Sequence, residues 1–151
     1  MADTTGKLCH LKQDGPVWFL AGTYGTKRTI RTCEVPRGKY LFFPLVNYVF
    51  YPVHPDSTCA YNQERAAEMT NDVSSLVLEI DGVRAKDLTV HRLATEKCFD
   101  LNELSGGGIY PAAANGYYVM LAPLKPGSHT LNFGGVLPRM SQAVTYTIHV
   151  R

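Results

Sequence analysis

Histidines and carboxylates are the side chains of this 151-residue chain that could perform acid–base chemistry, and they are scattered along it. The histidines form neither a His-x-His pair nor a His-Glu-x-x-His motif, so no sequence-local zinc site is predicted. Glu79 and Asp81 share one face of an expected strand, but their place before a turn favours a solvated surface. A small secreted hydrolase with an Asp/Glu/His site is therefore only an alternative, and no catalytic residue is assigned. The histidines are His10, His54, His91, His129 and His149.

Motifs for nucleophilic catalysis or phosphate binding are not found in the sequence. No Gly-x-Ser-x-Gly motif occurs, and Gly106-Gly107-Gly108 lacks the Lys and Ser/Thr that follow in a phosphate-binding loop. Asp56, Asp100 and Glu103 lie in or beside expected loops, where oxygen ligands could hold calcium, but their spacing does not match a calcium-binding loop. We therefore expect no metal and no cofactor.

The four cysteines, Cys9, Cys33, Cys59 and Cys98, are widely spaced and form no Cys-x-x-Cys pair. An even count without metal-site spacing predicts two disulfides and an oxidising compartment. Buried free thiols in a cytosolic protein are the alternative. Of the three possible pairings we favour Cys9–Cys33 with Cys59–Cys98, because each bond then stays within one region of the chain.

Aromatic residues give the strongest indication of a binding surface. The chain has nine tyrosines, and a tyrosine at a sheet face or loop rim offers a flat apolar ring with a hydrogen-bonding tip. Tyr48, Phe50, Tyr51 and Tyr110 are the candidate binding residues, together with the loop 102–116. Such a surface suits a protein partner, self-association or a carbohydrate, and burial in the core is the alternative.

The stretch 39–52 is nearly all apolar or aromatic and carries a charge only at Lys39. Because it does not alternate apolar and polar residues, it predicts a strand in the middle of a sheet that is covered on both faces, or covered on one face by the fold and on the other by a partner. Pro44 cannot donate to a sheet ladder, so it predicts a bulge or a break. Asn47 is the one strongly polar side chain inside the stretch and requires a hydrogen-bond partner if it is buried.

The remaining chain predicts short strands and one helix. The helix is expected over 62–74, with Asn62 as its N-cap. Residues 17–21 and 28–35 are expected to pair as a hairpin, Asp81-Gly82 predicts a second hairpin, and Gly134-Gly135 is expected to end a strand. The expected strands are 17–21, 28–35, 75–81, 83–85, 88–93, 97–101, 117–122, 129–133 and 144–150.

This pattern predicts an all-β fold with one short helix: an antiparallel β-sandwich, jelly-roll-like or immunoglobulin-like, in one domain over 1–151 with an N-terminal arm over 1–15. Hydrophobic residues make up 45% of the chain and the net charge is only +2, which does not favour nucleic-acid binding. No apolar run is long enough for a membrane span. The first residues are not those of a signal peptide.

Several phrases together resemble a group of uncharacterised bacterial exported proteins, which usually carry a signal peptide ahead of this region. The resemblance covers most of residues 9–150 and implies export, to the periplasm, the cell surface or the medium, and a β-rich fold. It implies no activity and no catalytic residue. The phrases are GPVWFLAGT at 15–23, RTCEVPRGK at 31–39, LFFP at 41–44, GYYVMLAPL at 116–124 and PGSHTLNFGG at 126–135.

Overall fold

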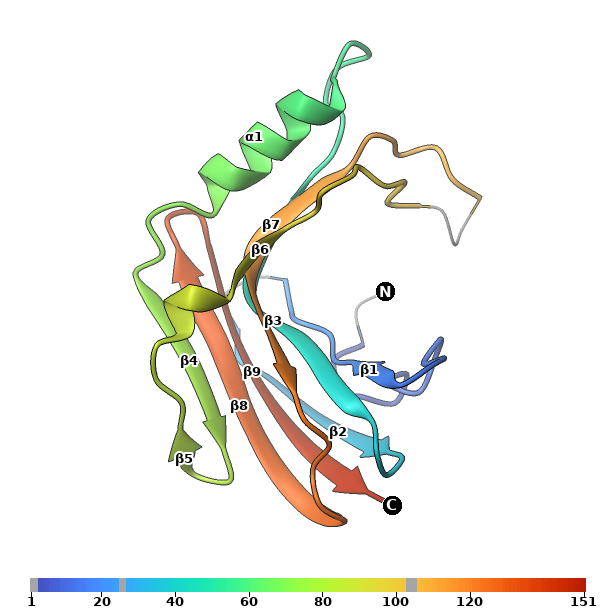
Figure 1. Ribbon diagram of the computed structural model, residues 1–151, viewed down its shortest axis with the longest axis vertical. Coiled ribbons are helices and arrows are strands. Elements are labelled where there is room, and N and C mark those ends of the chain that lie inside the picture. Colours follow the sequence, from blue (N-terminus) through green and yellow to red (C-terminus); the bar gives the residue numbers. More distant parts are fainter. Residues whose placement is uncertain (1–2, 25–26, 103–105) are drawn as a thin grey trace.

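The computed structural model describes residues 3–24, 27–102 and 106–151, and it consists mainly of two packed β-sheets (Figure 1). This confirms the predicted all-β sandwich with one short helix. Sheet A has the strand order β1-β3-β7-β6, and sheet B has the order β2-β9-β8-β4-β5. The strands of sheet A are β1 (Val17–Phe19), β3 (Tyr40–Phe50), β7 (Ala113–Leu121) and β6 (Arg92–Ala94). Those of sheet B are β2 (Thr29–Val35), β9 (Met140–Val150), β8 (Gly127–Leu137), β4 (Ser75–Ile80) and β5 (Val83–Arg84).

Both sheets are mixed, so the expectation of a purely antiparallel sandwich is wrong. The β1–β3 and β2–β9 pairs are parallel, and the other pairs are antiparallel. The predicted hairpin between 17–21 and 28–35 is also wrong, because these two segments belong to different sheets. The hairpin at Asp81-Gly82 is confirmed, with Ile80 opposite Val83. The jelly-roll-like or immunoglobulin-like assignment stays a prediction.

The core lies between the sheets and is centred on aromatic rings. The ring of Phe43 lies 4.6 Å from that of Phe133, which stacks on Tyr146 at 6.1 Å. Along β2, Arg31, Cys33 and Val35 alternate inward, as the period of two predicts. Residues Tyr40–Phe50 of the stretch 39–52 form β3, an interior strand of sheet A, as predicted. The expected cover on both faces is incomplete, because the face that carries Phe42 and Pro44 is only half-buried.

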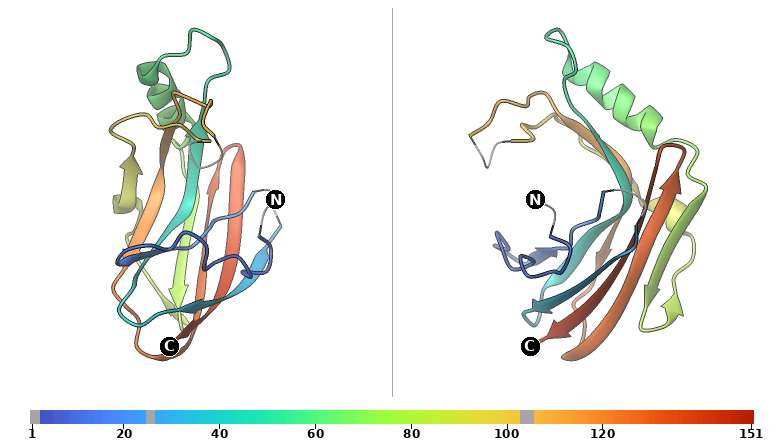
Figure 2. Two further views of the ribbon diagram at one scale, coloured as in Figure 1. Left: turned by 90° about the vertical axis from the view of Figure 1, so that its right-hand side faces the viewer. Right: turned by 180° about the vertical axis from the view of Figure 1, so that it is seen from behind.

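Strand β3 is interrupted by a bulge at the position that Pro44 predicts. The pairing with β7 shifts register between Pro44 and Val46, so Leu45 is the additional residue. A bulge bends its strand and increases the local twist. Sheet A is accordingly curved, with β1 and the arm at one end of its concave side and the described parts of the β6–β7 connection at the other (Figures 1 and 2).

Gln142 of β9 hydrogen-bonds to two backbone carbonyls at this bulge. Its side-chain Nε2 donates to the carbonyl oxygens of Pro44 and Leu45, at 2.7 and 2.6 Å. Its Oε1 accepts the backbone N–H of Thr23 at 3.1 Å. One buried carboxamide therefore joins sheet B, the bulge of sheet A and the loop after β1, because buried backbone polar groups require partners.

Glycines allow the backbone to approach the bulge closely. A Cβ on Gly116 would lie 2.4 Å from the Cβ of Asn47, and one on Gly134 would lie 2.2 Å from the carbonyl oxygen of Gln142. The expectation that Gly134-Gly135 ends a strand is wrong, because β8 continues through both glycines to Leu137. The physical reason is that this segment needs the absence of side chains rather than a turn conformation.

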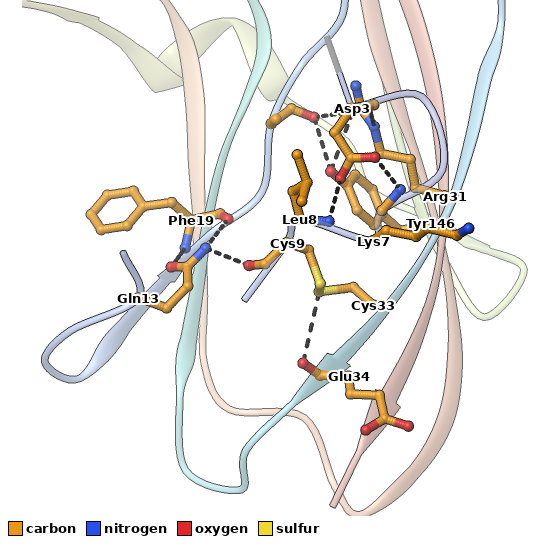
Figure 3. The surroundings of a disulfide bond; sticks show 12 residues. Asp3, Lys7, Leu8, Cys9, Gln13, Phe19, Arg31, Cys33, Glu34 and Tyr146 are labelled. Atoms are coloured by element: carbon orange, nitrogen blue, oxygen red, sulfur yellow. Dashed lines mark hydrogen bonds between the residues drawn. A yellow bond between two sulfur atoms is a disulfide. The ribbon is translucent and has the colours of Figure 1, made fainter. Parts of the chain in front are cut away.

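The N-terminal arm covers the edge strands of both sheets and is joined to β2 by the Cys9–Cys33 disulfide (Figure 3). The Gln13 carboxamide pairs with both the N–H and the carbonyl of Phe19 on β1, and Thr5 accepts the N–H of Thr32 on β2. Covering an edge in this way blocks unwanted strand pairing. The second disulfide joins Cys59 to Cys98, so both predicted pairings are present.

Within the described ranges one α-helix occurs, α1 (Cys59–Met69), which begins three residues before the predicted start and ends five residues before the predicted end at 74. Thr58 is the N-cap and accepts the N–H of Tyr61, whereas Asn62 is buried and donates to the Pro111 carbonyl. Arg92 of β6 donates to the Ala67 carbonyl near the end of the helix. The expected strand 88–93 is a 3₁₀ turn, η1 (Leu88–His91), followed by β6, and the expected strand 97–101 has only the isolated bridge of Phe99 to Ala112.

Substitution of Gln142 tests its role at the bulge. We expect Gln142→Ala to lower the free energy of unfolding by about 2–4 kcal/mol, since two buried carbonyls lose their donor. Gln142→Glu keeps the shape but places a carboxylate against the same carbonyls, so it should destabilise more at neutral pH than at pH 4. The measurement is urea unfolding at both pH values. Equal stability of all three proteins would contradict this role.

Candidate functional site

A groove of about 490 Å³ lies beside the bulge and is the candidate functional site. We call it the tyrosine groove. Residues from both sheets and three connections line it: Leu20, Ala21, Gly22, Thr23, Tyr24, Pro44, Asn47, Tyr48, Val49, Tyr51, Leu101, Met140 and Gln142. Its size lies within the usual range of small-molecule sites, roughly 300–1,000 Å³.

One wall of the groove is the segment 20–24, which crosses from sheet A towards sheet B. Gln142 holds it at the Thr23 N–H, as described above. Arg31 holds it from the other side, with Nη1 donating to the carbonyls of Ala21 at 2.6 Å and Gly22 at 3.0 Å. The wall is therefore fixed by side chains of two strands of sheet B, although it has no regular structure itself.

Arg31 is buried and lies between the groove wall and the N-terminal arm. Its Nε donates to the Asp3 carbonyl at 2.7 Å, and its guanidinium lies over the ring of Tyr146 at 5.5 Å from the ring centre. Burial raises the pKa of the Tyr146 hydroxyl, and the Arg31 charge partly offsets this effect. Carbonyl oxygens and an aromatic face thus solvate this cation, and the arm helps to position the groove wall.

Asn47 lies on the groove side of β3, opposite Gly116 of β7. Burial raises the pKa of the Tyr118 hydroxyl on β7, and the Asn47 side chain partly offsets this effect. Asn47 is only half-buried, so the condition under which the sequence required a partner for it is not met. The absence of a side chain at Gly116 leaves room for Asn47 at this position.

The four predicted binding residues are divided between different surroundings. Tyr48 and Tyr51 line the groove, and Tyr51 is 50% exposed. Phe50 is half-buried and packs edge-to-face against Tyr61 of α1. Tyr110 is 63% exposed in the β6–β7 connection but does not line the groove. The structure thus brings two of the four together, and the part of the loop at 103–105 lies outside the described residues.

Other lining residues had no signal in the sequence. Tyr24 stands in a turn-like segment and is 91% exposed, and Leu101 and Met140 reach the groove from a connection and from the first residue of β9. Their positions depend on the crossing of 20–24 between the sheets and on the β8–β9 hairpin, which are long-range features. For Tyr24, a tyrosine beside a glycine in a turn-like segment was the one sequence feature that could have marked it as a binding residue.

The groove lining carries no Asp, Glu, Lys, Arg or His within the part of the chain that the structure describes. Asp100, a candidate calcium ligand, instead accepts backbone N–H groups of Gly108, Asn102 and Ile109, which hold its pKa below the ordinary value. Among residues 3–24, 27–102 and 106–151, no group of three or more His, Cys, Asp or Glu residues could hold a metal ion. Glu103 lies outside these ranges.

A histidine–carboxylate pair does exist, but it lies away from the groove. His129 Nδ1 is 2.7 Å from Asp81 Oδ2, and its Nε2 is 2.8 Å from the Lys125 carbonyl oxygen. Both ring nitrogens are occupied, so the imidazole has no free nitrogen to act as a base. Glu79, the other carboxylate of the predicted pair, accepts a hydrogen bond from Asn132.

Comparisons with protein-family models, curated proteins and solved structures find no match to this chain. The described part of the chain contains no helix with the length and apolar character needed to cross a membrane. The groove and its surroundings are therefore the basis for the function proposed below.

The Asp81–His129 pair predicts a pH-dependent stability. The hydrogen bond to Asp81 raises the pKa of His129 above 6.5, and the bond from His129 lowers the pKa of Asp81 below 3.8. Because the pKa of His129 is raised, its contribution to stability is complete below pH 6.5 and is lost as the pH rises through its folded pKa. Because the pKa of Asp81 is lowered, its contribution is present above pH 3.8 and is lost as the pH falls through its folded pKa.

Asp81→Asn should therefore lower the free energy of unfolding most between pH 3.8 and 6.5, by about 1 kcal/mol because the pair is partly exposed. The difference from the unsubstituted chain should shrink towards pH 9. Chemical unfolding across this range measures it. A difference that stays constant with pH would contradict the pairing.

Proposed function

We propose that this protein is an exported, non-catalytic binding module whose ligand occupies the tyrosine groove. The observation that carries the proposal is a preformed concave site whose lining is aromatic and uncharged among the described residues. Sites for small molecules are commonly concave and mainly apolar, with a few placed polar groups. Here these groups include the Asn47 carboxamide and the hydroxyls of the lining tyrosines.

Export is proposed from the two disulfides, Cys9–Cys33 and Cys59–Cys98. Disulfides persist in oxidising compartments and are rare in the cytosol. The Cys9–Cys33 bond ties down the arm whose Asp3 carbonyl accepts from Arg31. An oxidising environment would therefore support the groove as well as the fold.

A second copy of the chain is the competing occupant of this surface. Exposed Tyr24 and Tyr51 at the rim would suit a protein interface, since tyrosine is common in interfaces. Light scattering at high protein concentration separates the two: a dimer that Tyr51→Ala dissociates supports self-association, and a monomer supports a separate ligand.

Catalysis is less well supported than binding. The His129 ring has both nitrogens engaged, and Asp81 and His129 do not line the groove. A hydrolase requires an acid or base within hydrogen-bond reach of its substrate. The hydrolase alternative would thus need ionisable groups beyond those described around the groove.

A fragment screen by ligand-observed NMR tests the proposed site. Small neutral aromatic and polyol fragments should bind the protein, and Tyr51→Ala should weaken them about tenfold, or ~1.4 kcal/mol, through lost ring contact. Tyr40→Ala is the matched control, because Tyr40 lies on β3 with 44% exposure but does not line the groove. The proposal would be contradicted if no fragment bound, or if Tyr51→Ala left the fragment affinities unchanged.

A further inference from the structure

The tyrosine groove has the chemistry of a site for an uncharged oligosaccharide, and this inference rests on the binding function proposed above. Of its lining residues, nine are apolar or aromatic and three are polar, Thr23, Asn47 and Gln142, with Gly22 completing the set. We infer that the ligand is a segment of a neutral polysaccharide.

The lack of charged side chains among the described lining residues argues against an ionic ligand. A charged group placed in the groove would lose water and meet no counter-ion among the described lining residues. Burial of an unpaired charge is strongly unfavourable. Acidic polysaccharides, nucleic acids and phosphorylated ligands therefore fit this site less well than neutral ones.

The polar groups argue against a purely apolar ligand. Asn47, Tyr48 and Tyr51 are lining residues with polar ends, and any of these ends that a hydrocarbon covered would lose hydrogen bonds to water. A sugar ring supplies an apolar C–H face for a tyrosine ring and hydroxyls at its edge for these groups. Tyrosine suits such a ligand because it combines a flat apolar ring with a polar tip.

The shape argues for a chain segment rather than a single enclosed molecule. Tyr24 at the rim is 91% exposed and Tyr51 is 50% exposed, so aromatic surface continues from the groove into solvent. Gln142 holds the backbone at Pro44 and at Thr23, and Arg31 holds the wall at Ala21, so little order has to be gained on binding. A polymer could lie across the site with both of its ends outside.

Affinity electrophoresis in native gels tests the inference with named probes: xyloglucan, galactomannan and mixed-linkage β-glucan as neutral polymers, and polygalacturonate as an acidic one. We expect retardation by at least one neutral polymer and none by polygalacturonate. Binding to that neutral polymer should be unchanged between about 50 and 500 mM salt, because no ion pair contributes.

Variants place this binding at the groove. Tyr51→Ala should raise the dissociation constant for the retarding polymer at least tenfold, Tyr51→Phe should retain most of the affinity through its ring, and Tyr40→Ala should leave it unchanged. The inference would be overturned if the protein bound only polygalacturonate, in a salt-sensitive way. It would also be overturned if Tyr51→Ala left binding to the neutral polymer intact.

The fragment screen separates failure of this inference from failure of the proposed function. If fragments bind at Tyr51 but none of the neutral polymers retards the protein, the carbohydrate assignment is overturned and the binding groove remains. If neither fragments nor polymers bind, both proposals are overturned.

Discussion

The hydrogen bonds of the Gln142 carboxamide are the interaction on which the arrangement of this protein depends. Pro44 removes a donor from β3, and at the bulge beside it the carbonyls of Pro44 and Leu45 accept hydrogen bonds from sheet B. Gln142 donates to both and accepts from Thr23. A single side chain thus joins the bend in sheet A, the packing of sheet B and the path of the loop after β1.

The groove results from this bend in β3 and from the segment 20–24, which forms one of its walls. The segment 20–24 passes between the sheets, where Gln142 and Arg31 hold its backbone. The arm covers Arg31 through the Asp3 carbonyl and is fixed by the Cys9–Cys33 disulfide. Fold stability and groove geometry therefore share the same contacts, and oxidation of one cysteine pair supports both.

Local chemistry accounts for the features that were predictable from sequence. Pro44 lacks an N–H and gave the bulge, Asp81-Gly82 gave the hairpin, and proximity along the chain gave the disulfide pairs. The parallel pairs, the path of β8 through Gly134-Gly135 and the partners of Gln142 were not predictable, because they arise from contacts between distant segments. Tyr48 and Tyr51, which the aromatic stretch marked as candidate binding residues, line the groove, whereas Leu101 and Met140 reach it through contacts between distant segments and were missed.

Hydrogen exchange at the backbone amide of Thr23 is the most direct test of the central claim. Thr23 lies in a connection, where amides ordinarily exchange quickly. Because its N–H donates to buried Gln142, we predict that it exchanges as slowly as amides of the core strands, such as that of Phe133. We further predict that Gln142→Ala makes it exchange quickly while Phe133 stays protected. Rapid exchange of Thr23 in the unsubstituted protein would contradict the account.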